Sequence, residues 1–264
     1  MPYCQVSEEV ALYYEDVGDG APIVFVHGFG MSLSVWENQV LELSKSFRCI
    51  SFDLRGHGAS DKPSDGYTIE QNARDVYALI QSLHLNRPIY VGWSLGVAIA
   101  IHFAKLYSNV LSKAVLVGGT PCWGRLADFE HGHTQSDIDA WLYEIIENRP
   151  LWTGGFVENL FYNEVDAMTS TWLFNQAMRV PLHATAKTIE DSRWADLRPY
   201  LSAFDCPVLL LHGQHDALDS VEAAKYMEDK IQDARLVVFE NSGHAIFIEE
   251  RAKFNKELRK FIER

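Results

Sequence analysis

The stretch Ile89-Tyr90-Val91-Gly92-Trp93-Ser94-Leu95-Gly96 joins a short apolar run to a serine that lies between two glycines. The apolar run predicts a buried strand, and the small residues that follow at 97–100 predict a helix. At such a strand-to-helix turn the backbone is strained, and flanking glycines let other chain segments approach closely. The G-x-S-x-G pattern in this context predicts an exposed, reactive hydroxyl on Ser94.

Short β-branched runs alternate with amphipathic segments along the rest of the chain. The runs are almost continuously apolar, which indicates strands buried on both faces of a mostly parallel sheet. Their alternation with helical patterns predicts an α/β fold in which helices cover both faces. We expect strands at 22–26, 48–52, 88–91, 113–117, 207–211 and 235–239, helices at 35–43, 69–83, 95–107, 220–230 and 247–262, and an antiparallel hairpin at about 3–14.

The strands at 113–117 and 207–211 are separated by about 90 residues without a convincing strand, which is far longer than an ordinary crossover. This separation predicts an inserted helical cap. We therefore divide the chain into a core, residues 1–120 and 198–264, and a cap, residues 121–197. With Pro150 and Pro181 as breaks, the expected cap helices are 137–147, 153–162, 165–178 and 183–191.

A serine nucleophile needs a histidine that takes its proton and a carboxylate that orients this histidine. Asp216 and His244 each follow a predicted strand, where catalytic groups gather in open α/β sheets. The order serine, aspartate, histidine is the one expected for this pattern. Asp219 is an alternative acid, but its place just before the helix at 220–230 favours a role as helix cap. We predict a triad of Ser94, Asp216 and His244.

Ten histidines compete for the role of base, and position rather than residue type favours His244. His27 follows a strand and is interpreted as organising its loop. Arg55 and His57 lie in a glycine-rich turn, where we expect them to hydrogen-bond to loops. His131 and His133 could suggest a metal ligand pair, but a third ligand is missing nearby. We predict neither a metal site nor a cofactor.

Composition limits the classes of partner. The net charge of −13 argues against nucleic-acid binding, which needs clustered lysine and arginine. No apolar run reaches the roughly 18 residues that would span a bilayer, so no membrane association is expected. The N-terminus lacks the basic start and apolar block of a secretory signal, which predicts a cytoplasmic location. Four widely spaced cysteines predict free buried thiols: Cys4, Cys49, Cys122 and Cys206.

Five motifs resemble the α/β-hydrolase superfamily over nearly the whole chain: His27-Gly28-Phe29-Gly30, Asp53-Leu54-Arg55-Gly56-His57-Gly58, Gly92-Trp93-Ser94-Leu95-Gly96, Gly213-Gln214-His215-Asp216 and Gly243-His244. The resemblance implies the α/β-hydrolase fold and an acyl-enzyme mechanism. It also implies an oxyanion hole formed by the backbone N–H groups of Phe29 and Leu95.

Trp93 and the segment Pro121-Cys122-Trp123 are similar to the pimeloyl-acyl-carrier-protein methyl ester esterases. Those esterases dock an acidic carrier protein through basic cap residues. Here residues 123–196 contain twelve Asp or Glu and five Lys or Arg. This balance would repel an acidic carrier, so we carry over the ester chemistry but not the carrier-bound substrate.

The predicted function is a serine carboxylesterase acting on small or medium apolar esters. Aromatic residues are frequent in the cap, and we expect Trp93, Trp123, Trp152 and Trp172 to contact substrate. Carrier-protein methyl ester hydrolysis, lactone hydrolysis and perhydrolysis stay open as alternatives, because the same fold supports them with a serine. A receptor of this fold that binds a ligand without turnover is an alternative of another class. The expected partner is a small-molecule ester, and the oligomeric state is left open.

Overall fold

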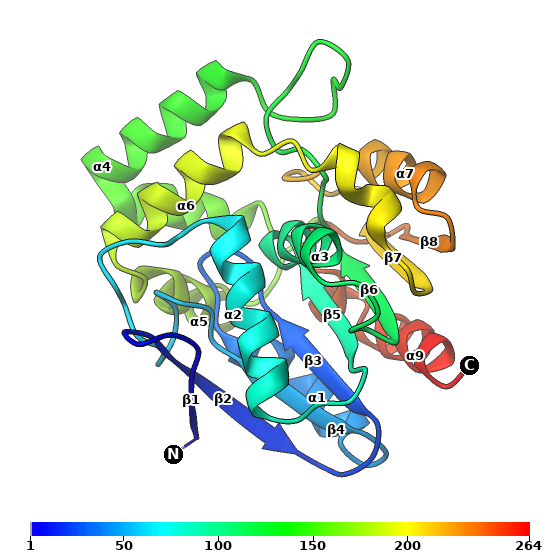
Figure 1. Cartoon of the computed structure of the whole chain (residues 1–264). Helices are drawn as coiled ribbons and strands as arrows, with labels where there is room; N and C mark the ends of the chain where they lie inside the picture. The colour runs from blue at the N-terminus through cyan, green and yellow to red at the C-terminus, as the bar shows by residue number, and fades with distance from the viewer. Residues whose placement is uncertain (1) are drawn as a thin grey trace.

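The computed structural model describes residues 2–264, and within them one eight-stranded sheet runs through the molecule in the order β1-β2-β4-β3-β5-β6-β7-β8 (Figure 1). The β1–β2 and β2–β4 pairs are antiparallel, and all other neighbours are parallel. The strands are β1 Tyr3–Gln5, β2 Ala11–Val17, β3 Pro22–Val26, β4 Arg48–Phe52, β5 Ile89–Trp93, β6 Lys113–Val117, β7 Val208–Gly213 and β8 Ala234–Phe239. The mostly parallel sheet predicted from the apolar runs is confirmed.

Side chains alternate between the two faces of the sheet, and each face is covered by its own helices. Val24 and Val26 of β3 belong to the core cluster under α2, α3 and α7, whereas Ile23 and Phe25 belong to the cluster under α1 and α9. This double burial explains why the strands are almost continuously apolar. The covering helices are α1 Glu37–Leu43, α2 Ile69–Ser82, α3 Leu95–Leu106, α7 Val221–Lys230, α8 Ile246–Glu249 and α9 Arg251–Ile262, with a 3₁₀ turn η1 at Leu33–Trp36.

Three further helices, α4 Gln135–Glu158, α5 Ala167–Met178 and α6 Leu182–Trp194, lie together beyond the carboxyl ends of the parallel strands (Figure 1). They occupy the segment in which the sequence predicts a helical cap. The two helices expected on either side of Pro150 meet at a kink within α4, where Asn148 takes non-helical φ and ψ values of −149° and 67°. A 3₁₀ helix, η2 Arg198–Ala203, leads back to the sheet. No helix within residues 2–264 has the length and apolar character needed to cross a membrane.

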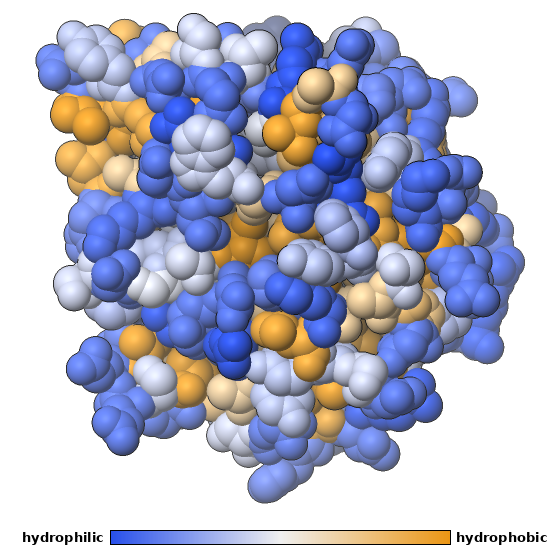
Figure 2. All heavy atoms as spheres, turned by 45° about the horizontal axis from the view of Figure 1, so that its top comes forward, coloured by the Kyte–Doolittle hydropathy of each residue, from blue (hydrophilic) through white to orange (hydrophobic). Residues whose placement is uncertain are grey.

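On the face that carries this helical layer, apolar and polar surface areas alternate (Figure 2). Several exposed side chains of α4 contribute to the apolar surface, among them Tyr143, Ile146 and Leu151. α4 also exposes Glu144 and Glu147. The helix therefore presents a mixed apolar and acidic surface to solvent.

A buried ion pair joins the loop after β4 to α2. Arg55 Nε lies 2.6 Å from Asp75 Oδ2, and Arg55 Nη2 lies 2.8 Å from Oδ1. The two side chains are 5% and 1% exposed. Gln71 adds a hydrogen bond from its Nε2 to Asp75 Oδ1, at 3.0 Å. The loop that contains Arg55 is thus fastened to the helix by a bidentate contact shielded from water.

Removing one partner of this pair should be costly. Asp75→Ala leaves the Arg55 guanidinium buried without a counter-ion, so the free energy of unfolding should fall by about 3 kcal/mol. The matched control is Asp16→Ala, which removes the pair between Asp16 and Arg48, with both side chains about a third exposed; it should cost less than about 1 kcal/mol. Urea denaturation of both variants measures the difference, and equal losses would contradict the expectation.

Candidate active site

Ser94 occupies the turn between β5 and α3 with a backbone conformation that non-glycine residues rarely adopt. Its φ is 55° and its ψ is −113°, and such strain persists mainly at functional sites. The flanking glycines are needed for space: a Cβ at Gly92 would lie 2.5 Å from the carbonyl oxygen of Gly96, and one at Gly96 would lie 2.8 Å from that of Val26. The chain can turn this sharply only because both positions lack a side chain.

Asp216 and His244 form a buried pair, as their positions after β7 and β8 predict. Asp216 Oδ2 lies 2.8 Å from His244 Nδ1, and Asp216 Oδ1 accepts hydrogen bonds from the backbone N–H groups of Leu218 and Asp219, each at 2.9 Å. His212 Nε2 lies 3.3 Å from Asp216 Oδ2. The carboxylate is therefore held on both oxygens, and it fixes the orientation of the His244 ring.

The two members of this pair shift each other's pKa. Burial would raise the pKa of Asp216, but attraction to His244 and hydrogen bonds from His212 and His244 outweigh it, so the pKa lies below its ordinary value. Burial would lower the pKa of His244, but the charge and hydrogen bond of Asp216 raise it above its ordinary value. This arrangement keeps the carboxylate ionised and makes His244 a better proton acceptor than a buried histidine alone.

Trp93 connects the serine turn to the histidine loop. Its Nε1–H donates to the carbonyl oxygen of His244 at 3.1 Å, and the two ring centroids are 5.4 Å apart. The side chain is 1% exposed and packs against Phe247. The expectation that Trp93 contacts substrate is therefore wrong: as the last residue of β5 it points, like Val91, into the core on the α9 face.

Two backbone N–H groups next to Ser94 have no acceptor within residues 2–264, those of Phe29 and Leu95. Both residues line the same cavity as Ser94. The Phe29 loop lies against the serine turn, because a Cβ at Gly28 would be 3.1 Å from the Cβ of Ser94. Free N–H groups on both sides of a serine hydroxyl can stabilise an oxyanion.

Two histidines hold this loop in place. His27 Nε2 accepts a hydrogen bond from the backbone N–H of Leu54 at 2.9 Å, and His57 Nε2 accepts one from Gly30 at 3.3 Å. Burial lowers the pKa of His27 to about 4, and burial together with His27 lowers the pKa of His57 to about 3. Both rings are neutral acceptors near pH 7, which fits the interpretation that they organise loops.

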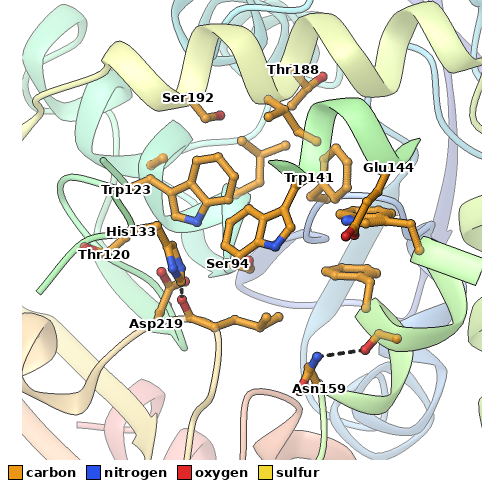
Figure 3. A pocket seen from close by; sticks show the side chains of 18 of the residues that line it. Ser94, Thr120, Trp123, His133, Trp141, Glu144, Asn159, Thr188, Ser192 and Asp219 are labelled. Carbon is orange, nitrogen blue, oxygen red and sulfur yellow. Dashed lines mark hydrogen bonds between the residues drawn. The ribbon is translucent and has the colours of Figure 1, made fainter. Parts of the chain in front are cut away.

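A cavity of about 630 Å³ opens above Ser94, between the sheet and the helical layer (Figure 3). Its walls are largely aromatic. Trp152 stacks on Phe156 with ring centroids 5.4 Å apart, and Trp123 lies 5.6 Å from Trp141. Trp123 and Trp152, which the sequence predicts to contact substrate, both line this cavity.

Trp172, by contrast, does not line the cavity. It is partly buried and packs against the core cluster on the α9 face. An aromatic helix residue can face either the cavity or the core, and its position in α5 turns Trp172 towards the core. The expectation that Trp172 contacts substrate is wrong for this reason.

The cavity wall also includes residues that were not among the predicted site residues, notably Trp141, His133 and Asp219. His133 Nε2–H donates to the carbonyl oxygen of Leu218 at 2.6 Å and so supports the loop before α7. Asp219 was expected to cap α7, but Ser220 does so, with its Oγ accepting from the N–H of Glu222 at 3.2 Å. Because Ser220 and not Asp219 is the N-cap residue of α7, the Asp219 side chain lines the cavity instead.

Comparison with known proteins agrees with this architecture. A family model described as the alpha/beta hydrolase fold matches residues 21–251. The chain is 34% identical to the AB hydrolase superfamily protein YisY of Bacillus subtilis, over 98% of each chain. It is 32% identical to a pimeloyl-[acyl-carrier protein] methyl ester esterase of Nitrosomonas europaea, over 90% of this chain and 94% of the relative.

Among solved structures, the esterase EaEST from Exiguobacterium antarcticum is similar, with a TM-score of 0.96, 31% identity and 99% coverage of each chain. The likeness therefore includes the serine turn, the aspartate and histidine loops and the helical layer together. The match of the family model over most of the length and the identity to full-length relatives lead to one conclusion. The chain belongs to the α/β-hydrolase family.

Proposed function

We propose that the protein hydrolyses carboxylic esters through an acyl-enzyme on Ser94. The observation that carries this proposal is the buried Asp216–His244 pair, connected through Trp93 to a serine at positive φ on the cavity wall. A serine needs such a pair to become a nucleophile at neutral pH. Relatives whose names include esterase support the same chemistry.

In the first half-reaction, His244 Nε2 takes the proton of Ser94 Oγ while Oγ attacks the ester carbonyl carbon. The N–H groups of Phe29 and Leu95 donate to the oxyanion that forms, and each such donor contributes about 3 kcal/mol in the transition state. The C–O bond to the alcohol then breaks, and His244 gives its proton to the departing oxygen. Asp216 holds the Nδ1–H tautomer throughout.

In the second half-reaction, water attacks the acyl-enzyme. His244 takes a proton from the water, the tetrahedral intermediate collapses, and Ser94 Oγ regains its proton as the carboxylic acid leaves. The same base therefore serves both half-reactions. Each turnover consumes one ester and one water and releases one acid and one alcohol.

The aromatic walls favour small or medium apolar acyl groups over strongly polar ones. The twelve acidic residues in residues 123–196, against five basic ones, disfavour an acidic carrier protein. We therefore propose that free esters are better substrates than carrier-bound esters, although one relative is named as an acyl-carrier-protein methyl ester esterase.

The test is repeated turnover of p-nitrophenyl esters of graded acyl length. A burst of one p-nitrophenol per protein followed by steady release indicates an acyl-enzyme that turns over. Binding without steady release would refute the proposal and favour a ligand receptor. Lactone and peracid assays, run in parallel, show whether lactone hydrolysis or perhydrolysis is faster than hydrolysis of these esters.

Trp152 should influence acyl-length preference. It stacks on Phe156 and meets Phe29 edge-on, with ring centroids 6.3 Å apart, next to the oxyanion loop. Trp152→Ala should lower the ratio of kcat/KM for hexanoate over acetate by about tenfold, since the acyl chain loses contact with an aromatic wall that contributes about 1–2 kcal/mol. Trp172→Ala is the matched control, because Trp172 faces the core, and the ratio should change less than about twofold. Equal changes in the two variants would contradict this prediction.

A further inference from the structure

Asp219 places a carboxyl group in the wall of the cavity without a protein partner (Figure 3). The residue is 7% exposed. Its backbone is fully engaged, because its N–H donates to Asp216 Oδ1 at 2.9 Å and its carbonyl oxygen accepts from His212 Nε2 at 2.7 Å. Within residues 2–264, however, neither carboxyl oxygen has a hydrogen-bond or ion-pair partner.

A buried carboxylate without a partner is costly. Burial accordingly raises the pKa of Asp219. A ligand that supplies a positive charge would remove this penalty, because it replaces the lost water with a counter-ion. The histidines that act on this carboxyl group, His244, His133 and His212, lower its pKa by less than burial raises it, so a cationic ligand group would be stabilised here.

The charges around the cavity have one sign. Three exposed carboxylates line it in addition to Asp219, those of Glu144, Glu147 and Glu158. None of the three pairs with a basic side chain in the part of the chain that the structure describes, and no lysine or arginine from that part lines the cavity. The mouth and the wall are thus negative, which concentrates cations and repels anions.

Tryptophan faces lie on the same side of the cavity as Asp219. Trp123 contacts His133 with ring centroids 5.5 Å apart and lies 5.6 Å from Trp141. Figure 3 shows Trp123, His133 and Trp141 as one group of rings, with Asp219 next to the His133 ring. Indole rings bind ammonium groups over their faces, most strongly where water is excluded. Carboxylate and indole together match a tertiary or quaternary ammonium rather than a neutral apolar group.

The position of Asp219 indicates which portion of the ester would carry the ammonium group. Asp219 is bonded through its N–H to the carboxylate that orients His244, and its charge acts on His244. In the proposed reaction His244 passes its proton to the departing alcohol oxygen. The alcohol portion of the ester therefore lies towards His244, on the side of Asp219.

We propose that the preferred substrates are esters whose alcohol portion carries a tertiary or quaternary ammonium group, which is bound by Asp219 and the faces of Trp123 and Trp141. The inference rests on the proposed function, which it narrows to a substrate class. The acyl portion remains small and apolar, against Phe29 and the aromatic wall near Trp152.

The test compares two acetate esters of the same shape that differ only in charge, 2-(trimethylammonio)ethyl acetate and 3,3-dimethylbutyl acetate. For the wild type, kcat/KM should favour the ammonium ester at least tenfold. Asp219→Asn should reduce this preference to about threefold or less, since the buried carboxylate is its main source. The matched control is Asp229→Asn, which removes one negative charge from the exposed end of α7 and should keep the preference. Equal kcat/KM for both esters in the wild type, or an unchanged preference in Asp219→Asn, would overturn the inference.

A binding measurement separates this inference from the proposed function. Calorimetry on the Ser94→Ala protein compares (2-hydroxyethyl)trimethylammonium with 3,3-dimethylbutan-1-ol. The cation should bind more tightly than the neutral alcohol, and this difference should be lost in Ser94→Ala/Asp219→Asn. That result supports the cation site even if the wild type hydrolyses no ester; in that case only the proposed function fails. Hydrolysis of p-nitrophenyl acetate without any preference for the cation supports the proposed function and refutes the inference.

Discussion

Ser94→Ala should lower kcat for p-nitrophenyl acetate by about 10⁴-fold or more, because loss of the nucleophile of such a triad costs between roughly 10⁴ and 10⁶ in rate. The fold should survive. Alanine has the same Cβ as serine and meets the same strain at a φ of 55°. The Ser94 N–H bond to the carbonyl oxygen of Val117, at 2.9 Å, does not depend on the hydroxyl. The midpoint of thermal unfolding should therefore shift by no more than a few degrees.

The measurement combines steady-state hydrolysis with thermal unfolding followed by circular dichroism. Ser202→Ala provides the control, since Ser202 is exposed on η2, and it should behave as the wild type in both assays. If Ser94→Ala kept more than a few per cent of the activity, another residue would have to be the nucleophile. Lost activity with a lowered unfolding midpoint in Ser94→Ala would mean that the turn itself had collapsed.

The sheet and the serine turn could be predicted from sequence because their signals are local. β3, β4 and β6 begin and end where the apolar runs do. β5 extends two residues past its predicted end, through Gly92 and Trp93, and stops only where Ser94 takes a positive φ. Backbone pairing with β6 continues through these residues, and pairing depends on the neighbouring strand rather than on the residue type.

The direction in which single side chains point could not be predicted in the same way. Trp93 and Trp172 are aromatic and lie near the expected site, but each turns towards the core on the α9 face. Asp219 fits the pattern of a helix cap, and only the choice of Ser220 as the actual cap sends its carboxyl group into the cavity. These outcomes depend on contacts between segments far apart in the sequence, which composition and periodicity do not encode.

The second large expected effect is a loss of kcat on substitution of Asp216, in contrast to its neighbour Asp219. Asp216→Asn should lower kcat by about 10³- to 10⁴-fold, since an amide cannot both hold the Nδ1–H tautomer of His244 and stabilise the imidazolium that forms. Asp219→Asn should cost at least a hundredfold less on a neutral ester, because the Asp219 carboxyl group does not contact His244 through a hydrogen bond. A larger loss in Asp219→Asn than in Asp216→Asn would require the two roles to be exchanged.

The pH profile tests the same assignment independently of the rate. Only neutral His244 can act as the base, so activity is lost as the pH falls through the pKa of His244. In the wild type, Asp216 raises this pKa against the effect of burial. In Asp216→Asn that support is absent and burial dominates, so the acid limb of kcat/KM for the residual activity should move to lower pH. An acid limb that stayed in place in Asp216→Asn, and moved in Asp219→Asn instead, would identify Asp219 as the carboxylate that governs His244.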